Sequence, residues 1–105
     1  MPFSAVPNSD IKRILSEKKQ DILSIAEKHG ASNIRVFGSV VRGEATQDSD
    51  IDFLIDYDIE KTTSWFPTGL IHDLEALLER KVDIVPADSI HYFIRDRILG
   101  EAVSL

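Results

Sequence analysis

Between positions 11 and 26 the apolar residues recur every three or four positions, the spacing that places side chains on one face of a helix. These residues are Ile11, Ile14, Leu15, Ile22, Ile25 and Ala26. The pattern predicts a helix that is capped by Asn8 or Ser9 and ends near His29, where Gly30 can stop it. The wholly polar stretch 18–20 could break this helix.

Three short runs rich in β-branched and aromatic residues predict strands at 33–37, 51–57 and 81–85. The first run ends at Gly38, and one or two helical turns are expected from there to Gly43, before a polar loop. Side chains alternate between the two faces of a strand. In the second run, Ile51, Phe53 and Ile55 should therefore face one side of the sheet. Asp50, Asp52 and Leu54 should face the other side.

Two later stretches again have helical spacing. The first begins at Pro67, which suits the first turn of a helix, and the second is amphipathic and follows a cap at Asp88 or Ser89. Their apolar stripes are Leu70, Ile71, Leu74, Leu77 and Leu78 in the first and Ile90, Phe93, Ile94, Ile98 and Ala102 in the second. This order of helices and strands predicts a layered α/β domain with a small sheet. The chain is expected to be one domain, 1–105, with residues 1–8 as a loose arm.

The composition narrows the range of functions. Apolar residues make up 43% of the 105 residues and charged residues 29%, which is typical of a soluble globular protein. The net charge of −6 argues against direct nucleic-acid binding and leaves a metal–nucleotide substrate or a basic protein partner. The chain has no cysteine, which excludes disulfides, thiolate metal sites and cysteine nucleophiles. No apolar run approaches the roughly 18 residues of a membrane span, and no signal peptide is evident, so a cytoplasmic protein is expected.

Three acids are the strongest candidates for chemistry. Asp50 and Asp52 project to the same side of the second predicted strand, and two such carboxylates repel unless they share a proton or a cation. Oxygen-only ligands of this kind suit Mg²⁺, which water and substrate phosphates usually complete. Asp83 is expected to be buried in the apolar run 81–85; beside the second strand it would complete a two-metal site for phosphoryl or nucleotidyl transfer. The alternative for Asp83 is a lone acid at an exposed strand edge.

The residues before Asp50 are those expected of a phosphate-binding turn. Gly38 lets the backbone approach a ligand, and Ser39 adds a hydroxyl donor where the helical turn begins. Arg42 lies on the same helical face and could meet a phosphate, while Ser49 could orient the acid pair. Each has a plainer explanation: Ser39 as a helix cap, Arg42 as the partner of a nearby acid and Ser49 as a turn residue.

The remaining polar and aromatic residues give weaker signals. The three histidines share no metal-ligand spacing, so solvated or helix-terminal positions are expected for them. Arg95 and Arg97 are expected on a solvated helix face. Trp65 and Phe66 are expected in the core rather than on a partner-binding surface.

Together these residues match a known family. Gly38-Ser39, ten further residues and Asp50-Ile51-Asp52 form the GS-x10-DxD pattern of the DNA polymerase β-like nucleotidyltransferase superfamily. Arg42-Gly43 and Ser49 extend the pattern to GSxxRG-x5-SDxD, in which form the chain resembles the minimal nucleotidyltransferases, or MNT proteins. The resemblance covers nearly the whole chain. It implies an α+β fold in which helices pack on a small mixed β-sheet.

The resemblance also implies an activity. By match, Asp50 and Asp52 would bind two Mg²⁺ ions, Asp83 would be the third acid and the base, and the glycine–serine turn would hold the triphosphate of ATP. Many MNT proteins are antitoxins paired with HEPN-domain RNase toxins, and are proposed to transfer AMP from ATP to a toxin tyrosine. Larger relatives use a second domain to bind the base and the acceptor, and 105 residues leave no room for one. Recognition would then come from a partner, or from a homo- or hetero-oligomer.

Two other functions fit the sequence less well. A non-catalytic antitoxin would neutralise its toxin by direct binding and keep only a vestigial site, yet all three acids are present. Nucleotidyl transfer to a small molecule or an RNA end is disfavoured by the missing second domain, and the acidic balance further disfavours RNA.

Overall fold

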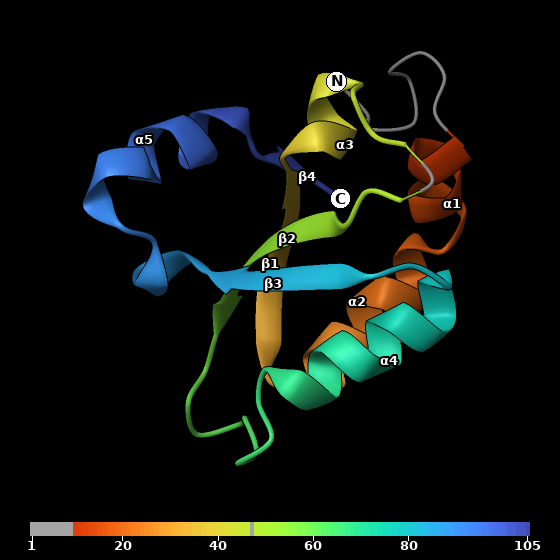
Figure 1. Cartoon of the computed structure of the whole chain (residues 1–105). Coiled ribbons are helices and arrows are strands. Elements are labelled where there is room, and N and C mark those ends of the chain that lie inside the picture. Colours follow the sequence, from red (N-terminus) through yellow and green to blue (C-terminus); the bar gives the residue numbers. More distant parts are fainter. Residues whose placement is uncertain (1–9, 47) are drawn as a thin grey trace.

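The computed structural model describes residues 10–46 and 48–105 (Figure 1). Its helices are α1 (Asp10–Glu17), α2 (Lys19–Lys28), α3 (Ser39–Arg42), α4 (Thr68–Leu78) and α5 (Tyr92–Glu101), with a 3₁₀-helix at Ala87–Ser89. Its strands are β1 (Ala31–Phe37), β2 (Ile51–Tyr57), β3 (Val82–Pro86) and β4 (Val103–Ser104). The predicted arm at 1–8 and the predicted cap at Asn8 or Ser9 lie outside the described residues.

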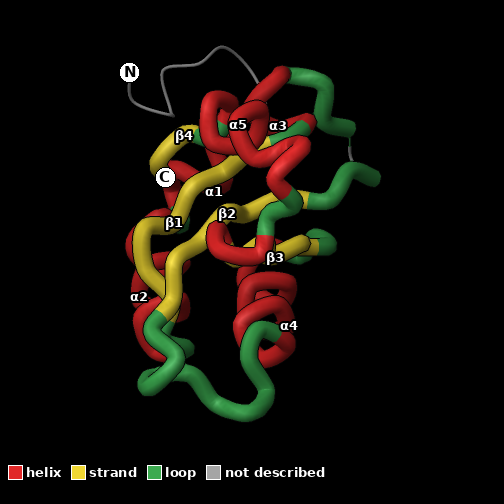
Figure 2. The backbone as a smooth tube through the Cα atoms, turned by 90° about the vertical axis from the view of Figure 1, so that its left-hand side faces the viewer, coloured by secondary structure: helices red, strands yellow, loops and turns green. Residues whose placement is uncertain are grey.

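The four strands form one mixed sheet in the order β3-β2-β1-β4. β1 is antiparallel to both β2 and β4, whereas β2 and β3 are parallel and are connected through α4. Helices α1, α2 and α4 pack on one face of the sheet, and α5 lies on the other (Figures 1 and 2). The fold is therefore of the predicted class, a small mixed β-sheet with helices packed on it.

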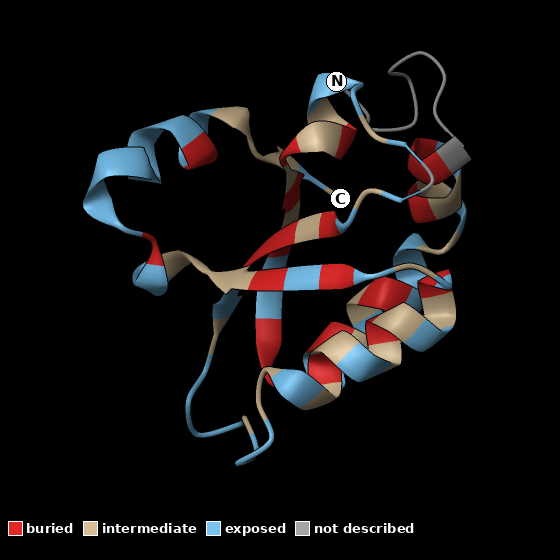
Figure 3. Ribbon diagram, viewed as in Figure 1, coloured by how far each residue is buried: buried red, intermediate tan, exposed pale blue. Residues whose placement is uncertain are grey.

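The face that carries α1, α2 and α4 holds the main core. Its side chains come from the helices and from alternate positions of the strands, as the pleat of a strand requires. Those at most 1% exposed include Leu15, Ile22, Val36, Phe53, Ile55, Leu70 and Leu74 (Figure 3). The opposite face buries a smaller cluster, Leu54, Ile90 and Ile98. Among the residues described, no helix has the length and apolar character that a membrane span needs.

Most of the predicted elements are confirmed. The predicted strand 51–57 coincides with β2, and the helical turn after Gly38 is α3. The polar stretch does break the first helix, because α1 ends before Lys18 and α2 begins after it. The short strand β4 is absent from the prediction, since two residues paired with β1 carry no periodic pattern.

Three expectations about the aromatic and capping residues are wrong. The cap of α5 is neither Asp88 nor Ser89 but His91, whose imidazole Nδ1 accepts the Phe93 N–H at 3.3 Å. Phe93 is 77% exposed instead of facing the sheet, and the buried residue of α5 is Ile98. Trp65 is 72% exposed, while the neighbouring Phe66 packs against the core as expected.

Candidate active site

Asp52 and Asp83 lie side by side on the two parallel strands. The register pairs Asp52 of β2 with Asp83 of β3, and pairs Asp52 on its other side with Phe37 of β1. Register partners on neighbouring strands point to the same face of a sheet. Asp50, just before β2, is exposed. Asp83 is exposed and not buried as expected, because β3 is the edge strand of the sheet and α5 leaves this part of the face open.

Burial and like charges act together on Asp52. They raise its pKa from the ordinary 3.8 to about 6. Loss of hydration is the largest cause, followed by repulsion from Asp83 and then from Asp50. Arg42 acts in the opposite direction. A cation among these carboxylates would relieve the repulsion that disfavours the charged form of Asp52.

The donor set suits a hard divalent cation. Asp50, Asp52 and Asp83 offer only carboxylate oxygens, the ligands that Mg²⁺ prefers. Across 10–46 and 48–105, no three His, Cys, Asp or Glu side chains already converge into a metal-ligating group. Asp50 and Asp83 are exposed, so burial does not fix the direction of their side chains. The chemistry of these residues therefore fits Mg²⁺, although the ligand geometry is not formed in advance.

The turn after β1 lies directly against Asp52. Gly38 is buried and has a φ of 82°, a backbone conformation that glycine adopts without strain. A Cβ at this position would overlap the Oδ2 atom of Asp52. The backbone angle thus favours glycine here, and a larger residue would also push the Asp52 carboxylate aside. Ser39 follows as the first residue of α3 and is half-buried.

Ser49 occupies a different position from the other predicted residues. Its Oγ accepts the Thr46 N–H at 2.8 Å and lies 3.3 Å from the Thr46 hydroxyl, so it shapes the loop before β2. This contact agrees with the plainer explanation of a turn serine. Neither Ser39, Ser49 nor Asp50 lines the pocket that contains Asp52 and Asp83.

Arg42 is held by two glutamates, one of which also reaches the glycine turn. The guanidinium Nε donates to Glu44 at 2.6 Å, and a terminal nitrogen donates to Glu101 at 2.7 Å. The second oxygen of Glu101 accepts the Gly38 N–H at 3.1 Å. Burial pushes the pKa of Glu101 upward, but the hydrogen bonds from Arg42 and Gly38 outweigh it and hold the pKa below its ordinary value.

Glu101 is a residue of this site that the sequence analysis did not single out. It is 63 positions from Gly38, and the motif assigns nothing to it. One signal was available. The helix dipole disfavours a carboxylate at the C-terminal end of a helix, so a glutamate at that position indicates a compensating interaction nearby.

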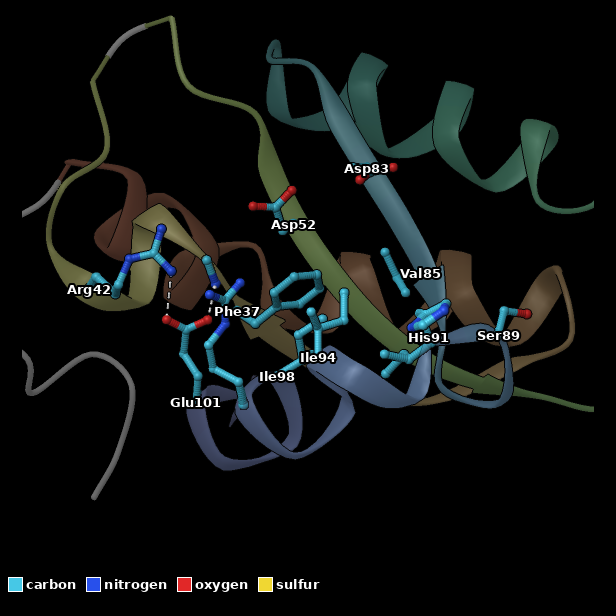
Figure 4. A pocket seen from close by; sticks show the side chains of 13 residues that line it. Phe37, Arg42, Asp52, Asp83, Val85, Ser89, His91, Ile94, Ile98 and Glu101 are labelled. Atoms are coloured by element: carbon cyan, nitrogen blue, oxygen red, sulfur yellow. Dashed lines mark hydrogen bonds and ion pairs between the residues drawn. The ribbon is translucent and has the colours of Figure 1, made fainter.

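The polar groups line a single pocket of about 400 Å³ (Figure 4). Its charged lining near the sheet consists of Arg42, Asp52, Asp83 and Glu101, with Gly38 between them. Its apolar lining comes from β1, β3, α5 and the segment before α5, and consists of Phe37, Val85, Ile90, Ile94 and Ile98. His91, at the predicted kind of helix-terminal position, and Arg97, on the predicted solvated face, are both exposed, and both also line the pocket.

Exposed aromatic residues stand beside the pocket. The imidazole of His91 stacks with the rings of Tyr92 and Phe93, with centroid distances of 5.0 Å to each. Tyr92 is 72% exposed, and Ile94 at 42% exposed continues this surface into the pocket lining. We call Tyr92, Phe93 and Ile94 the α5 apolar patch.

The fold and the site define a class of enzyme. A small mixed sheet with acids on neighbouring strands, next to a glycine turn and an arginine, is an arrangement suited to transferring a nucleotide. The chain belongs to the family described as the nucleotidyltransferase domain, whose model matches residues 9–105.

Similar proteins and structures agree with this assignment. The chain is 39% identical over 94 residues to the protein adenylyltransferase MntA of Thermococcus cleftensis, covering 90% of this chain and 91% of that protein. It is 37% identical to a candidate protein adenylyltransferase of Methanocaldococcus jannaschii, covering 87% and 97% of the two chains. A solved structure of a candidate minimal nucleotidyltransferase superposes with a TM-score of 0.77 at 40% identity, covering 89% and 94%.

A more distant structure shares the fold alone. It is a chain of a toxin–antitoxin crystal structure with AMP-PNP, which superposes with a TM-score of 0.68 at 19% identity. The match covers 82% of this chain and 70% of that chain.

Proposed function

We propose that this protein is a Mg²⁺-dependent adenylyltransferase that transfers AMP from ATP to a hydroxyl group of a partner protein. The observation that carries the proposal is the register of Asp52 with Asp83 in a pocket also lined by Gly38 and Arg42. The names of the similar proteins, which are protein adenylyltransferases, support AMP as the transferred group and a protein as the acceptor.

The nucleotide would be bound through its phosphates. The Gly38 N–H and the Arg42 guanidinium are donors suited to phosphate oxygens, with the Ser39 hydroxyl close by in the chain. In the proposal, Asp50, Asp52 and Asp83 hold Mg²⁺, as two ions, and the loop that Ser49 shapes orients Asp50 and Asp52. Bound Mg²⁺ neutralises charge on the triphosphate and on the leaving group.

The proposed step is an in-line displacement at the α-phosphorus of ATP. The acceptor oxygen forms a bond to that phosphorus, and the bond from the phosphorus to the oxygen bridging to the β-phosphate breaks. Pyrophosphate leaves with the electron pair, and the proton of the acceptor hydroxyl passes to a carboxylate oxygen of Asp83. Arg42 offsets negative charge that develops on the phosphates.

The α5 apolar patch supports a protein as the acceptor. Exposed apolar surface next to a charged pocket is typical of an interaction site, and Ile94 belongs to both. In the proposal, this patch docks the partner so that its hydroxyl enters the pocket. As the MNT resemblance implies, the partner is a HEPN-domain RNase toxin, the acceptor is a tyrosine, and the chain acts as the antitoxin.

The test is to incubate the protein with a HEPN toxin encoded beside it and to measure the intact mass of the toxin. The toxin should gain one or more AMP units with ATP and Mg²⁺, and none with EDTA. Neutralisation of the RNase with no mass gain would favour the non-catalytic antitoxin and contradict the proposal. AMP found only on a small molecule would contradict the proposed acceptor.

A further inference from the structure

The carboxylate of Glu101 occupies the same hydrogen-bond donors that the proposed function assigns to phosphate. One oxygen accepts the Gly38 N–H at 3.1 Å, and the other accepts an Arg42 N–H at 2.7 Å (Figure 4). A backbone N–H and a guanidinium that converge on two oxygens of one anion could equally serve two oxygens of a phosphate. Glu101 therefore stands where an anionic ligand would bind.

Three features around Glu101 disfavour a carboxylate. It is the last residue of α5, where the helix dipole repels an anion, and its side chain is only 18% exposed. Asp52 lies near enough for Glu101 to contribute to its raised pKa. The charge of Arg97 also favours the charged form of Glu101, and the hydrogen bonds from Gly38 and Arg42 hold its carboxylate in place.

Glu44 provides a comparison on the same arginine. Its carboxylate accepts the Arg42 Nε–H at 2.6 Å, and its side chain is 60% exposed. Glu44 and Glu101 both neutralise Arg42, but the contact to Gly38 is made by Glu101. Substituting each glutamate in turn therefore separates the effect of negative charge beside Arg42 from the effect of the hydrogen bond to Gly38.

We infer that Glu101 is an internal competitor for the phosphate subsite, so that a nucleotide binds by displacing its carboxylate from Gly38 and Arg42. The inference rests on the proposed function for the assignment of that subsite. Both contacts are made by the Glu101 carboxylate, so the exchange requires this one side chain to move. Glu101 thereby lowers the affinity for nucleotide and makes release easier.

The experiment compares AMP-PNP binding, with Mg²⁺, by calorimetry in the wild type and three variants. Glu101→Ala and Glu101→Gln should each lower the Kd, by about five- to tenfold for alanine and less for glutamine, which can still accept a hydrogen bond. Glu44→Gln should stay within about twofold of the wild type, because it leaves the Gly38 contact intact. Dispersed amide NMR spectra would show that each variant is folded.

Four results would overturn the inference. Weaker binding in both Glu101 variants would mean that Glu101 positions Arg42 for the nucleotide, and unchanged binding would mean that its carboxylate does not compete. An equal gain in AMP-PNP affinity in Glu44→Gln would show that the effect comes from the negative charge beside Arg42 and not from the contact with Gly38. If neither the wild type nor any variant bound AMP-PNP, there would be no phosphate subsite for Glu101 to occupy.

A second measurement, on the wild type, tests the inference without any substitution. Titration with AMP-PNP should shift the Gly38 amide signal and the Glu101 carboxylate carbon signal together, because one exchange changes both groups. A carboxylate signal that stays unchanged while nucleotide binds would contradict displacement. Neither measurement requires AMP transfer, so competition by Glu101 and transfer to a protein can fail independently.

Discussion

The two faces of the β-sheet differ in what their side chains do. The face under α1, α2 and α4 buries one continuous apolar cluster. The face under α5 buries Leu54, Ile90 and Ile98, and next to them carries acids, an arginine and the exposed α5 apolar patch. The first face has the composition of a core, and the second that of a binding site.

Strand β2 shows how one element serves both faces. Ile51 and Phe53 are at most 1% exposed and anchor the strand in the core, while Asp52 between them points to the open face. The raised pKa of Asp52 shows that its charged form is unfavourable in the fold. The core on one face thus allows the other face to hold groups that do not stabilise the protein. This division predicts that substitutions on the two faces will separate activity from stability.

Asp52→Asn should have the largest effect on activity and leave the fold intact. Loss of one carboxylate from the proposed metal site should reduce AMP transfer by at least about 10³-fold. Incorporation of labelled AMP into the partner measures the effect. Asp58→Asn, an exposed loop carboxylate, is the control and should transfer normally. Full activity in Asp52→Asn would refute the role proposed for Asp52.

Leu74→Ala should have the largest effect on stability. Leu74 is 1% exposed in the main core, and removal of a buried leucine side chain costs about 2–5 kcal/mol of unfolding free energy. Urea unfolding followed by circular dichroism measures this. Leu99→Ala, on α5 and 38% exposed, should cost less than about 1 kcal/mol. Similar losses at both sites would contradict the difference between the faces.

Tyr92→Ser should impair transfer to the partner without impairing nucleotide binding. If the α5 apolar patch docks the acceptor, transfer should fall by about tenfold while the Kd for AMP-PNP stays the same. Trp65→Ser is a matched control, because Trp65 is also 72% exposed but lies in the turn before α4 and not on α5. An equal loss in both variants would place the docking surface elsewhere.

The pH dependence of stability should show the smallest effect. Because the folded pKa of Asp52 is raised from 3.8 to about 6, the folded state binds more protons than the unfolded state between these values. Stability attributable to Asp52 should therefore be greatest below about pH 4 and fall as the pH rises to about 6. With a discount for solvent screening, the loss is about 1 kcal/mol.

Asp52→Asn removes this titration and tests it directly. The variant should melt a few degrees above the wild type at pH 7.5 and at about the same temperature at pH 4. For Asp58→Asn, the difference in melting temperature from the wild type should be the same at both pH values. If the wild type became more stable relative to Asp52→Asn as the pH rose from 4 to 6, the pH dependence would have the opposite sign and the prediction would be wrong.

Sequence reasoning was most successful where the signal is local. The alternation in 51–57 predicted β2 and the direction of Asp52, and the polar stretch predicted the break at Lys18. It was least successful along α5, where Phe93 fits an apolar stripe yet is exposed. Helical spacing shows which residues share a face, but not whether anything covers that face.

The sequence by itself determined the element order, the placement of Asp50 and Asp52 at the start of β2 and the glycine turn after β1, because these depend on spacing within a few residues. The tertiary structure alone decided that Asp83 is exposed beside Asp52, that Glu101 reaches Gly38 and Arg42, and that the α5 apolar patch adjoins the pocket. These features depend on how distant segments pack, and no short-range pattern encodes such contacts.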